Sequence, residues 1–459
     1  MSKEQTTLTF AEGDLFNRQP FCENLERYLL VEKDYVEGSL VVSLNAGFGS
    51  GKTTFLDMWK NDLTTRRKAG NFDPLPISLN AWENDFCGDP LLSVLTGMID
   101  ALDQWKPEEA EEKKNTLIEA TKDIGWFTLG LANGVTSKVG INAVAAGNLA
   151  EQKKEKRAAD APKNPDFITA YQERTSAFKN LKAAITKVFG GPSAKAIIFV
   201  DELDRCRPDF AIDYLETIKH VFDIEGLIFV LAIDQQQLAN SAKSLFGQDL
   251  NFPEYYRKFS HRTIDLPKPE EQNLKHLTTE YAKKYLSIEG TRHSGIKIDS
   301  HRIEQITELL FGFDVNPRQA KEIFRTVGHA LSCTKEDEGR ILWAYGVSVV
   351  FFAVIKTVDD ILYKQFRNES ISIDQVATLL NQKLDTEKAS WWLIVYITGS
   401  NRIKKESIDI ATLLEKHKFI ATTNGFNGSQ EIGQFSQGWN GSNIAGVFQR
   451  LEAIETSLA

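Results

Sequence analysis

The chain has 459 residues, enough for two or three domains of roughly 100 to 200 residues each. Its 42% hydrophobic and 25% charged residues are typical of a soluble globular protein. The formal net charge of −9 argues against sequence-independent binding to nucleic acid, although local basic clusters leave nucleic acid open as a partner.

The N-terminus and the cysteines indicate a cytoplasmic location. The first residues lack the apolar core of a signal peptide. The cysteines form no C-x-x-C pair, which predicts a reducing compartment without a disulfide framework or a zinc site. The segment from Ile341 to Ile355 is apolar but too short to cross a hydrocarbon core of roughly 30 Å. We therefore expect a buried core helix there and no membrane span.

The segment AGFGSGKTT, from Ala46 to Thr54, follows an apolar run and predicts a strand that enters a phosphate-binding loop. Glycines let the backbone N–H groups turn toward a polyphosphate, Lys52 places a positive charge on the β and γ oxygens, and the Thr53 hydroxyl can bind Mg²⁺. Ala46 replaces the first glycine of the usual motif, which a strand end tolerates. The expected nucleotide contacts in this segment are Gly47, Phe48, Gly49, Ser50, Gly51, Lys52, Thr53 and Thr54. ATP and Mg²⁺ are the expected cofactors, although the sequence does not distinguish ATP from GTP.

A second apolar run, Ala196 to Val200, predicts a strand buried on both faces of a parallel sheet. It ends in Asp201 and Glu202. A P-loop ATPase needs a carboxylate at this position to hold Mg²⁺ and a second carboxylate to polarise the attacking water. We assign these roles to Asp201 and Glu202.

Two further runs, Pro74 to Leu79 and Gly226 to Ile233, predict strands of the same sheet. The second ends in Asp234, which we expect near the γ-phosphate because ligands collect at the carboxyl ends of parallel strands. Phe210 to Phe222 has the apolar spacing of a helix. The predicted fold is α/β: a P-loop NTPase with a mostly parallel, doubly wound sheet.

Four segments together resemble the KAP family of P-loop NTPases, in the STAND-like group of ATPases. They are GFGSGKTT from Gly47, LNAW from Leu79, FVDELDRCRP from Phe199 and FVLAID from Phe229. The family typically has tryptophan where this chain has Phe48, and F-N-A-W where it has LNAW. The resemblance implies that Lys52 and Thr53 bind phosphate and Mg²⁺, and that Asp201 and Glu202 complete hydrolysis.

Three arginines have more than one interpretation. Arg205 matches the arginine of the family's D-R dipeptide, and it could act catalytically as an arginine finger or pair with Asp204. Arg257 is a candidate for an arginine that acts on a neighbouring subunit. Arg318 precedes a predicted helix, where it could contact the γ-phosphate from a lid or simply be exposed. Trp82 is interpreted as a packing anchor in preference to a base-stacking residue.

The long gap between Lys52 and Asp201 predicts a largely helical insertion at about 104–166, within a core of residues 1–267. Many KAP relatives have membrane-spanning helices there, but this segment is too polar to span. We expect a helical lid at 268–330 and an α-helical C-terminal region at 331–459. The Gly-, Asn-, Ser- and Gln-rich stretch from Asn424 to Gly446 predicts a long loop.

The leading functional prediction is a Mg²⁺-dependent ATPase whose nucleotide state drives a conformational change or assembly. A homo-oligomer or an effector protein is the expected partner. The family resemblance points toward bacterial anti-phage defence or exclusion. Two alternatives stay open: an ATP-binding scaffold with little turnover, and a motor or clamp stimulated by nucleic acid.

Overall fold

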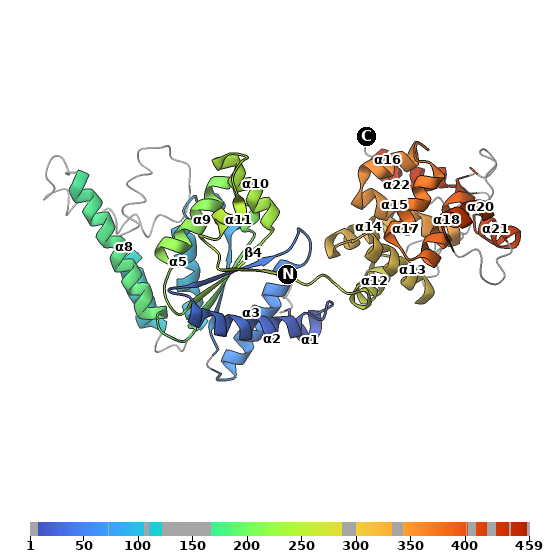
Figure 1. The fold of residues 1–459 in the computed structure, drawn as a ribbon. Helices are drawn as coiled ribbons and strands as arrows, with labels where there is room; N and C mark the ends of the chain where they lie inside the picture. The colour runs from blue at the N-terminus through green and yellow to red at the C-terminus, as the bar shows by residue number, and fades with distance from the viewer. Residues whose placement is uncertain are drawn as a thin grey trace. The chain divides into compact units, whose positions relative to one another are not determined.

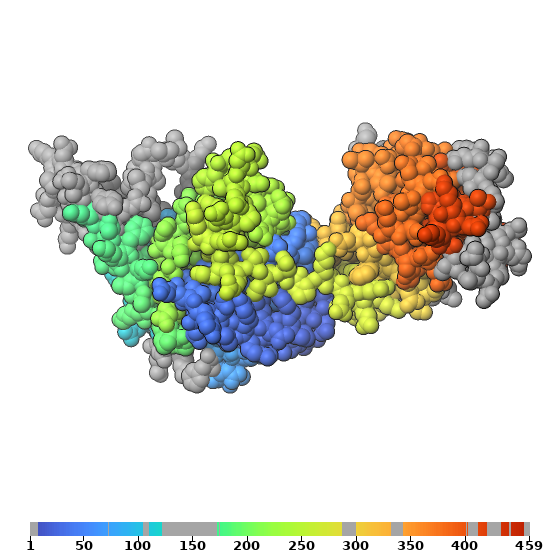
Figure 2. All heavy atoms as spheres, viewed as in Figure 1, coloured from blue at the N-terminus to red at the C-terminus, as the bar shows by residue number. Residues whose placement is uncertain are grey.

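The computed structural model describes residues 8–71, 73–104, 110–121, 167–286, 300–332, 343–400, 402, 410–419, 428–439 and 442–456. The chain divides into two compact units. The first comprises residues 1–14, 18–48 and 52–267, and the second comprises residues 15–17, 49–51 and 268–459. Figure 1 traces the elements of both units and Figure 2 draws their heavy atoms.

The first unit is built on a five-stranded sheet in the order β2-β3-β4-β1-β5 (Figure 1). Its strands are β1 (Leu40–Asn45), β2 (Leu75–Asn80), β3 (Ala196–Asp201), β4 (Leu227–Ile233) and β5 (Arg262–Asp265). All neighbouring strands are parallel. The chain goes from β1 to the far edge of the sheet, returns through β3 and β4, and passes over β1 to reach β5. In open α/β sheets, ligands bind at the carboxyl ends of the strands where the winding direction reverses in this way. The predicted doubly wound, parallel fold is confirmed.

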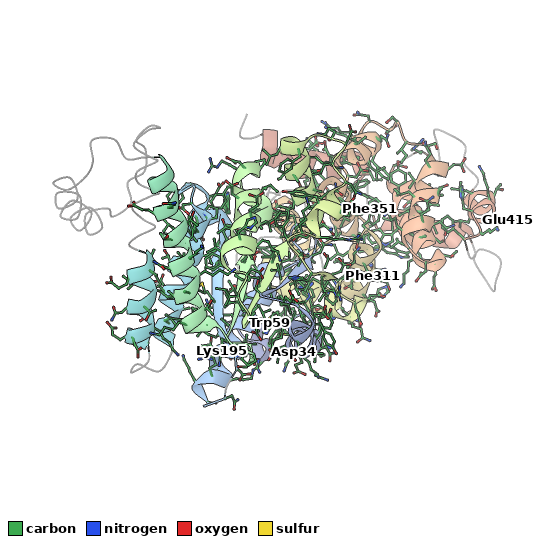
Figure 3. All side chains as sticks on the ribbon, turned by 60° about the vertical axis from the view of Figure 1, so that its left-hand side comes forward. Asp34, Trp59, Lys195, Phe311, Phe351 and Glu415 are labelled. Atoms are coloured by element: carbon green, nitrogen blue, oxygen red, sulfur yellow. The ribbon has the colours of Figure 1, made fainter. Side chains whose placement is uncertain are left out.

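Helices cover both faces of this sheet, which explains why its strands are almost continuously apolar. Val42 and Phe199 face a cluster that includes residues of α2 (Gln19–Glu32) and α3 (Lys52–Lys68). Within it Trp59 of α3, labelled in Figure 3, is fully buried with its ring centroid 4.9 Å from that of Phe199. Val41 and Ile198 face the opposite cluster, because successive strand residues point to opposite faces. The other elements of the first unit are α1 (Phe10–Gly13), η1 (Lys33–Tyr35), α4 (Ala81–Asp85), α5 (Pro90–Ala101), η2 (Leu102–Gln104), α8 (Phe167–Phe189), η3 (Leu203–Arg205), α9 (Pro208–Val221), α10 (Gln235–Phe246) and α11 (Phe252–Tyr256).

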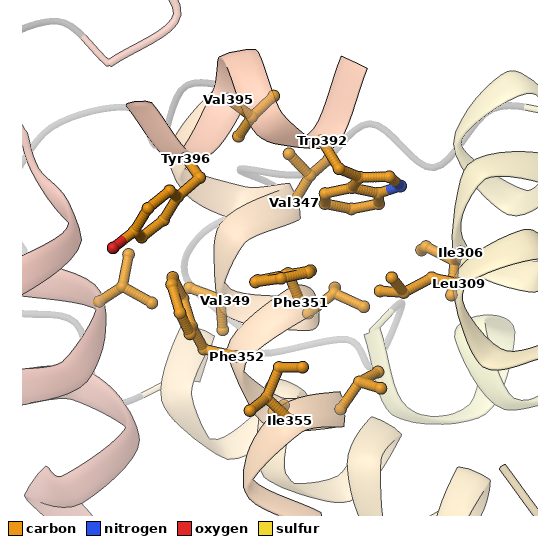
Figure 4. Packing of buried hydrophobic residues seen from close by; sticks show 14 of the residues in the cluster. Ile306, Leu309, Val347, Val349, Phe351, Phe352, Ile355, Trp392, Val395 and Tyr396 are labelled. Carbon is orange, nitrogen blue, oxygen red and sulfur yellow. The ribbon is translucent and has the colours of Figure 1, made fainter. Parts of the chain in front are cut away.

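All secondary-structure elements described in the second unit are helices, and α15 (Trp343–Val358) lies in its core. Every residue of α15 from Ala344 to Ile355 is buried. In the core drawn in Figure 4, the Phe351 ring stacks on Trp392, with 5.4 Å between the ring centroids. The prediction of a buried core helix here is confirmed. The other helices are α12 (Glu271–Leu286), α13 (Ser300–Gly312), α14 (Pro317–Ser332), α16 (Asp360–Arg367), α17 (Ile373–Lys383), α18 (Thr386–Gly399), α20 (Ile410–Lys416), α21 (Gly428–Gln437) and α22 (Ile444–Thr456).

The prediction of a long loop from Asn424 to Gly446 is wrong for its described residues. Helix α21 occupies Gly428–Gln437, and α22 begins at Ile444. Trp439 is only 3% exposed, and its Nε1 donates a hydrogen bond of 3.1 Å to Thr398 Oγ1. In α21 itself, Phe435 packs on Trp343 with 5.4 Å between the ring centroids, and such burial offsets the low helix propensity of the glycines.

Much of the predicted insertion lies outside the described residues, namely 105–109 and 122–166. Residues 110–121 are helical. The two compact units divide between Pro267 and Lys268. Leu310 and Phe324 share one hydrophobic cluster with Phe351, so the hydrophobic core runs on both sides of residue 330. The domain boundary between residues 330 and 331 stays a prediction. In the described part of the chain, no helix is both long enough and apolar enough to cross a bilayer.

Candidate nucleotide site

The predicted phosphate loop links β1 to α3. Gly49 has φ +82° and Gly51 has φ +88°, values in the left-handed region that glycine adopts without strain. Such turns aim successive backbone N–H groups inward and form a concavity that binds anions. Around Gly47 no atom lies within 4 Å of the position that a Cβ would take. The loop therefore has a backbone suited to a polyphosphate, directly before the N-terminus of a helix.

Lys52 is the first residue of α3 and is only 9% exposed. Its Nζ donates a hydrogen bond of 2.5 Å to the Ala46 carbonyl oxygen and lies 3.8 Å from Asp204 Oδ2. The ammonium group is thus held beneath the loop, where it can reach phosphate oxygens as a compact charge.

Asp204 is the carboxylate that faces Lys52. Its Oδ2 also accepts a hydrogen bond of 2.9 Å from the backbone N–H of Asp234. Burial raises the pKa of Asp204, and the nearby Lys52 and the backbone donors oppose this effect. The pairing of Asp204 with Lys52 was not predicted from the sequence, where Asp204 is a candidate partner of Arg205 only. The sequence feature that could have indicated this pairing is the position of Asp204, three residues after Asp201 at the end of β3.

Glu202 follows the end of β3 in a left-handed conformation, with φ +61°. Its Oε1 pairs with Arg205 Nη1 at 2.9 Å, and its Oε2 accepts a hydrogen bond of 3.3 Å from Asn80 Nδ2. The structural alternative proposed for Arg205, a pair with Asp204, is therefore wrong in its partner, which is Glu202. Asn80, at the end of β2, is a site residue that was not predicted from the sequence.

Trp82 is not a packing anchor, because its side chain is 52% exposed. It lies on α4, whose N-terminus is capped by the Asn80 side chain. The Arg205 guanidinium carbon lies 5.8 Å from the centroid of the Trp82 ring and 4.8 Å from that of Phe48. Trp82 therefore faces the site and its arginine instead of the core.

The residues predicted to bind Mg²⁺ have suitable chemistry. Thr53 is exposed in the first turn of α3, and Asp201 is the last residue of β3. Asp57 lies one helical turn beyond Thr53, on the same side of α3. Burial raises the pKa of Asp57, the nearby Lys60 lowers it, and the negative charge of Asp201 raises it further. Hydroxyl and carboxylate oxygens are the ligands that Mg²⁺ prefers, and the Mg²⁺ site at Thr53 and Asp201 stays a prediction.

The tips of β4 and β1 carry polar side chains that bond to their surroundings. The Asp234 carboxylate caps α10 by accepting hydrogen bonds of 3.1 and 3.3 Å from the backbone N–H groups of Gln236 and Gln237. Asn45 accepts a hydrogen bond from the Gln235 backbone at 3.0 Å and donates one to Asp265 at 2.7 Å. The γ-phosphate contact of Asp234 stays a prediction.

Of the other two predicted arginines, one belongs to each unit. Arg257 is exposed and follows α11 in the first unit. Arg318 is the second residue of α14 in the second unit. The N-terminus of α14 is closed by reciprocal hydrogen bonds between Asn316 and Gln319, of 2.9 and 3.0 Å. The nucleotide-related roles of both arginines stay predictions.

The chain is similar to several known proteins. The chain is 21% identical over 270 residues to the phage T7 exclusion protein of Escherichia coli (strain K12), in a match that covers 55% of this chain and 33% of that protein. The matched part is thus about a third of the relative's length.

Among solved structures, the chain is similar to the ORC2 protein of Aeropyrum pernix in its ADPNP-ADP complexes, with 12% identity and a TM-score of 0.37 over 91% of this chain and 84% of that one. The ADP form gives 11% identity and a TM-score of 0.34 over 92% and 84%. At these TM-scores the likeness says nothing about function. The model of the KAP family P-loop domain matches residues 18–333, which is more than half of the chain. The phosphate loop, the acidic end of β3 and this match together establish that the chain belongs to the KAP family of P-loop NTPases.

Proposed function

We propose that this chain is a Mg²⁺-dependent ATPase whose nucleotide state drives a conformational change or an assembly step. The observation that carries the proposal is the convergence of a buried lysine and two carboxylates on one edge of the sheet. Lys52 lies under the phosphate loop beside Asp204, and Glu202 directly follows the end of β3. A binding-only protein would need the loop and the lysine but not an anchored Glu202.

Each residue has a defined task in this proposal. The loop N–H groups and Lys52 hold the polyphosphate, and the Glu202 carboxylate accepts a hydrogen bond from the attacking water and orients it. Thr53 and Asp201 would hold Mg²⁺, directly or through water. When it is bound, Mg²⁺ would supply positive charge that offsets the charge on the phosphate oxygens.

The test is steady-state ATP turnover by the purified chain with Mg²⁺, compared with Glu202→Gln. This substitution keeps the size of the side chain but removes its charge. We expect turnover to fall at least about 100-fold while ATP affinity stays within about threefold. Equal turnover by both proteins would refute the role of Glu202. ATP binding without turnover would favour the scaffold alternative, and stimulation by DNA or RNA would favour the motor alternative.

We also propose a role in phage defence or exclusion, which is supported by the name of the Escherichia coli relative. The experiment is the efficiency of plaque formation on cells that express the chain or its Glu202→Gln variant. Protection that is lost in the variant is the expected result. Particle mass should be measured with and without ATP, because a nucleotide-dependent change in mass would identify assembly as the output.

A further inference from the structure

Two exposed aromatic rings lie against the guanidinium group of Arg205. Phe48 is 48% exposed and Trp82 is 52% exposed, and their ring centroids lie 4.8 and 5.8 Å from the Arg205 guanidinium carbon. One ring comes from the phosphate loop and the other from α4. Single exposed aromatics are common, but two segments that converge on one cation form a specific arrangement.

Arg205 in turn holds the carboxylate of Glu202. The ion pair at 2.9 Å occupies Oε1, and the Asn80 amide binds Oε2 at 3.3 Å. The left-handed backbone of Glu202, with φ +61°, is uncommon for a residue other than glycine and must be held by its surroundings. The Asn80 side chain also caps the helix that carries Trp82. These contacts connect the phosphate loop, α4 and the end of β3.

We propose that Phe48 and Trp82 form an aromatic clamp that fixes Arg205, and through it orients the Glu202 carboxylate for ATP turnover. This inference rests on the proposed ATPase function. A glutamate side chain has three rotatable bonds, and a general base acts only within hydrogen-bond reach of its water. Because Phe48 lies in the phosphate loop, the clamp connects the segment that holds the nucleotide to the carboxylate that acts on water. Phe48 and Trp82 are positioning residues in this account.

The first test separates aromatic character from bulk. Phe48→Leu and Trp82→Leu should each lower kcat by about two- to fivefold while KM changes less than about twofold, which is the scale of an exposed cation–π contact. Phe48→Trp and Trp82→Phe should retain more of kcat than the leucine variants, because they keep a ring face. Phe86, which is 71% exposed just after α4, provides the matched control: Phe86→Leu should leave kcat unchanged.

The second test is a double-mutant cycle with Arg205→Ala. If the rings act through Arg205, adding Phe48→Leu or Trp82→Leu to Arg205→Ala should lower kcat no further. Full additivity, or leucine variants with wild-type kcat, would overturn the positioning role.

The third test does not depend on turnover. In protein labelled with ¹⁵N-arginine, the Arg205 Nε–H signal, identified by its loss in Arg205→Lys, should be shifted by the ring currents. It should return toward the other arginine signals in both leucine variants. If the signal is shifted but the protein has no ATP turnover, the proposed function and the positioning role are refuted. The contact of the two rings with Arg205 would still be supported. An unshifted signal would refute the clamp even if turnover is normal.

Discussion

The Nζ of Lys52 lies 3.8 Å from Oδ2 of Asp204, and both side chains are nearly buried, at 10% and 7% exposed. This pair joins the first residue of α3 to the segment after β3. A buried ion pair contributes little net stability, but loss of one partner leaves an uncompensated charge. The pair therefore keeps the lysine charge at the phosphate loop, where its attraction to phosphate is screened little by water.

Lys52→Ala should weaken ATP binding by roughly 10- to 100-fold, because a charge-assisted contact to phosphate is lost. The fold should survive with a lower melting temperature, since the Asp204 carboxylate loses its cationic neighbour. The measurements are equilibrium titration with ATP and thermal unfolding.

Lys52→Ala combined with Asp204→Asn is the matched control. It should recover part of the lost melting temperature without recovering ATP affinity. Unchanged ATP affinity in Lys52→Ala would contradict the phosphate-loop assignment.

Two of the loop glycines, Gly47 and Gly51, should respond differently to alanine. Gly51 has φ +88°, so Gly51→Ala should cost about 1–2 kcal/mol of unfolding free energy through backbone strain. The space around Gly47 is open, so Gly47→Ala should leave the melting temperature within about 1 °C, consistent with a near-zero change in unfolding free energy. Equal losses of melting temperature in the two variants would show that the left-handed backbone at Gly51 is not what constrains the loop.

Asp57→Asn should stabilise the first unit at neutral pH and change its acid response. The folded-state pKa of Asp57 is raised above its ordinary value of 3.8, so the folded protein binds more protons than the unfolded chain just above that pH. Its contribution to stability therefore falls as pH rises through this window. We expect the variant to melt higher than wild type at pH 7, with the difference vanishing below about pH 4. A difference that grows toward acid pH would have the wrong sign.

Trp439→Ala should destabilise the second unit by about 3–5 kcal/mol, because it empties a buried aromatic site. Trp439→Phe keeps most of the volume and loses the hydrogen bond to Thr398, so its cost should be nearer 1 kcal/mol. Denaturant unfolding followed by circular dichroism measures both. If the two variants lose the same stability, packing is not the main contribution of this side chain.

The predicted strands of the first unit were recognisable because local physics decides them. A parallel strand buried on both faces needs an unbroken apolar run, and Ala196 to Val200 and Leu227 to Ile233 have one. The phosphate loop was recognisable because its left-handed turns need glycine. The loop prediction at Asn424 to Gly446 was wrong because it rested on composition alone, whereas Phe435 of α21 packs against Trp343 and Trp391.

The sequence by itself determined the parallel sheet, the loop that precedes α3 and the acidic end of β3, since each depends on residues adjacent in the chain. Only the tertiary structure decided the partners across the site. It paired Lys52 with Asp204 and Glu202 with Arg205 and Asn80, and it turned Trp82 toward the arginine. Such pairings depend on how the ends of β2 and β3 and the phosphate loop come close to one another at the carboxyl edge of the sheet. That approach is set by the packing of helices on both faces, and no local pattern in the sequence encodes it.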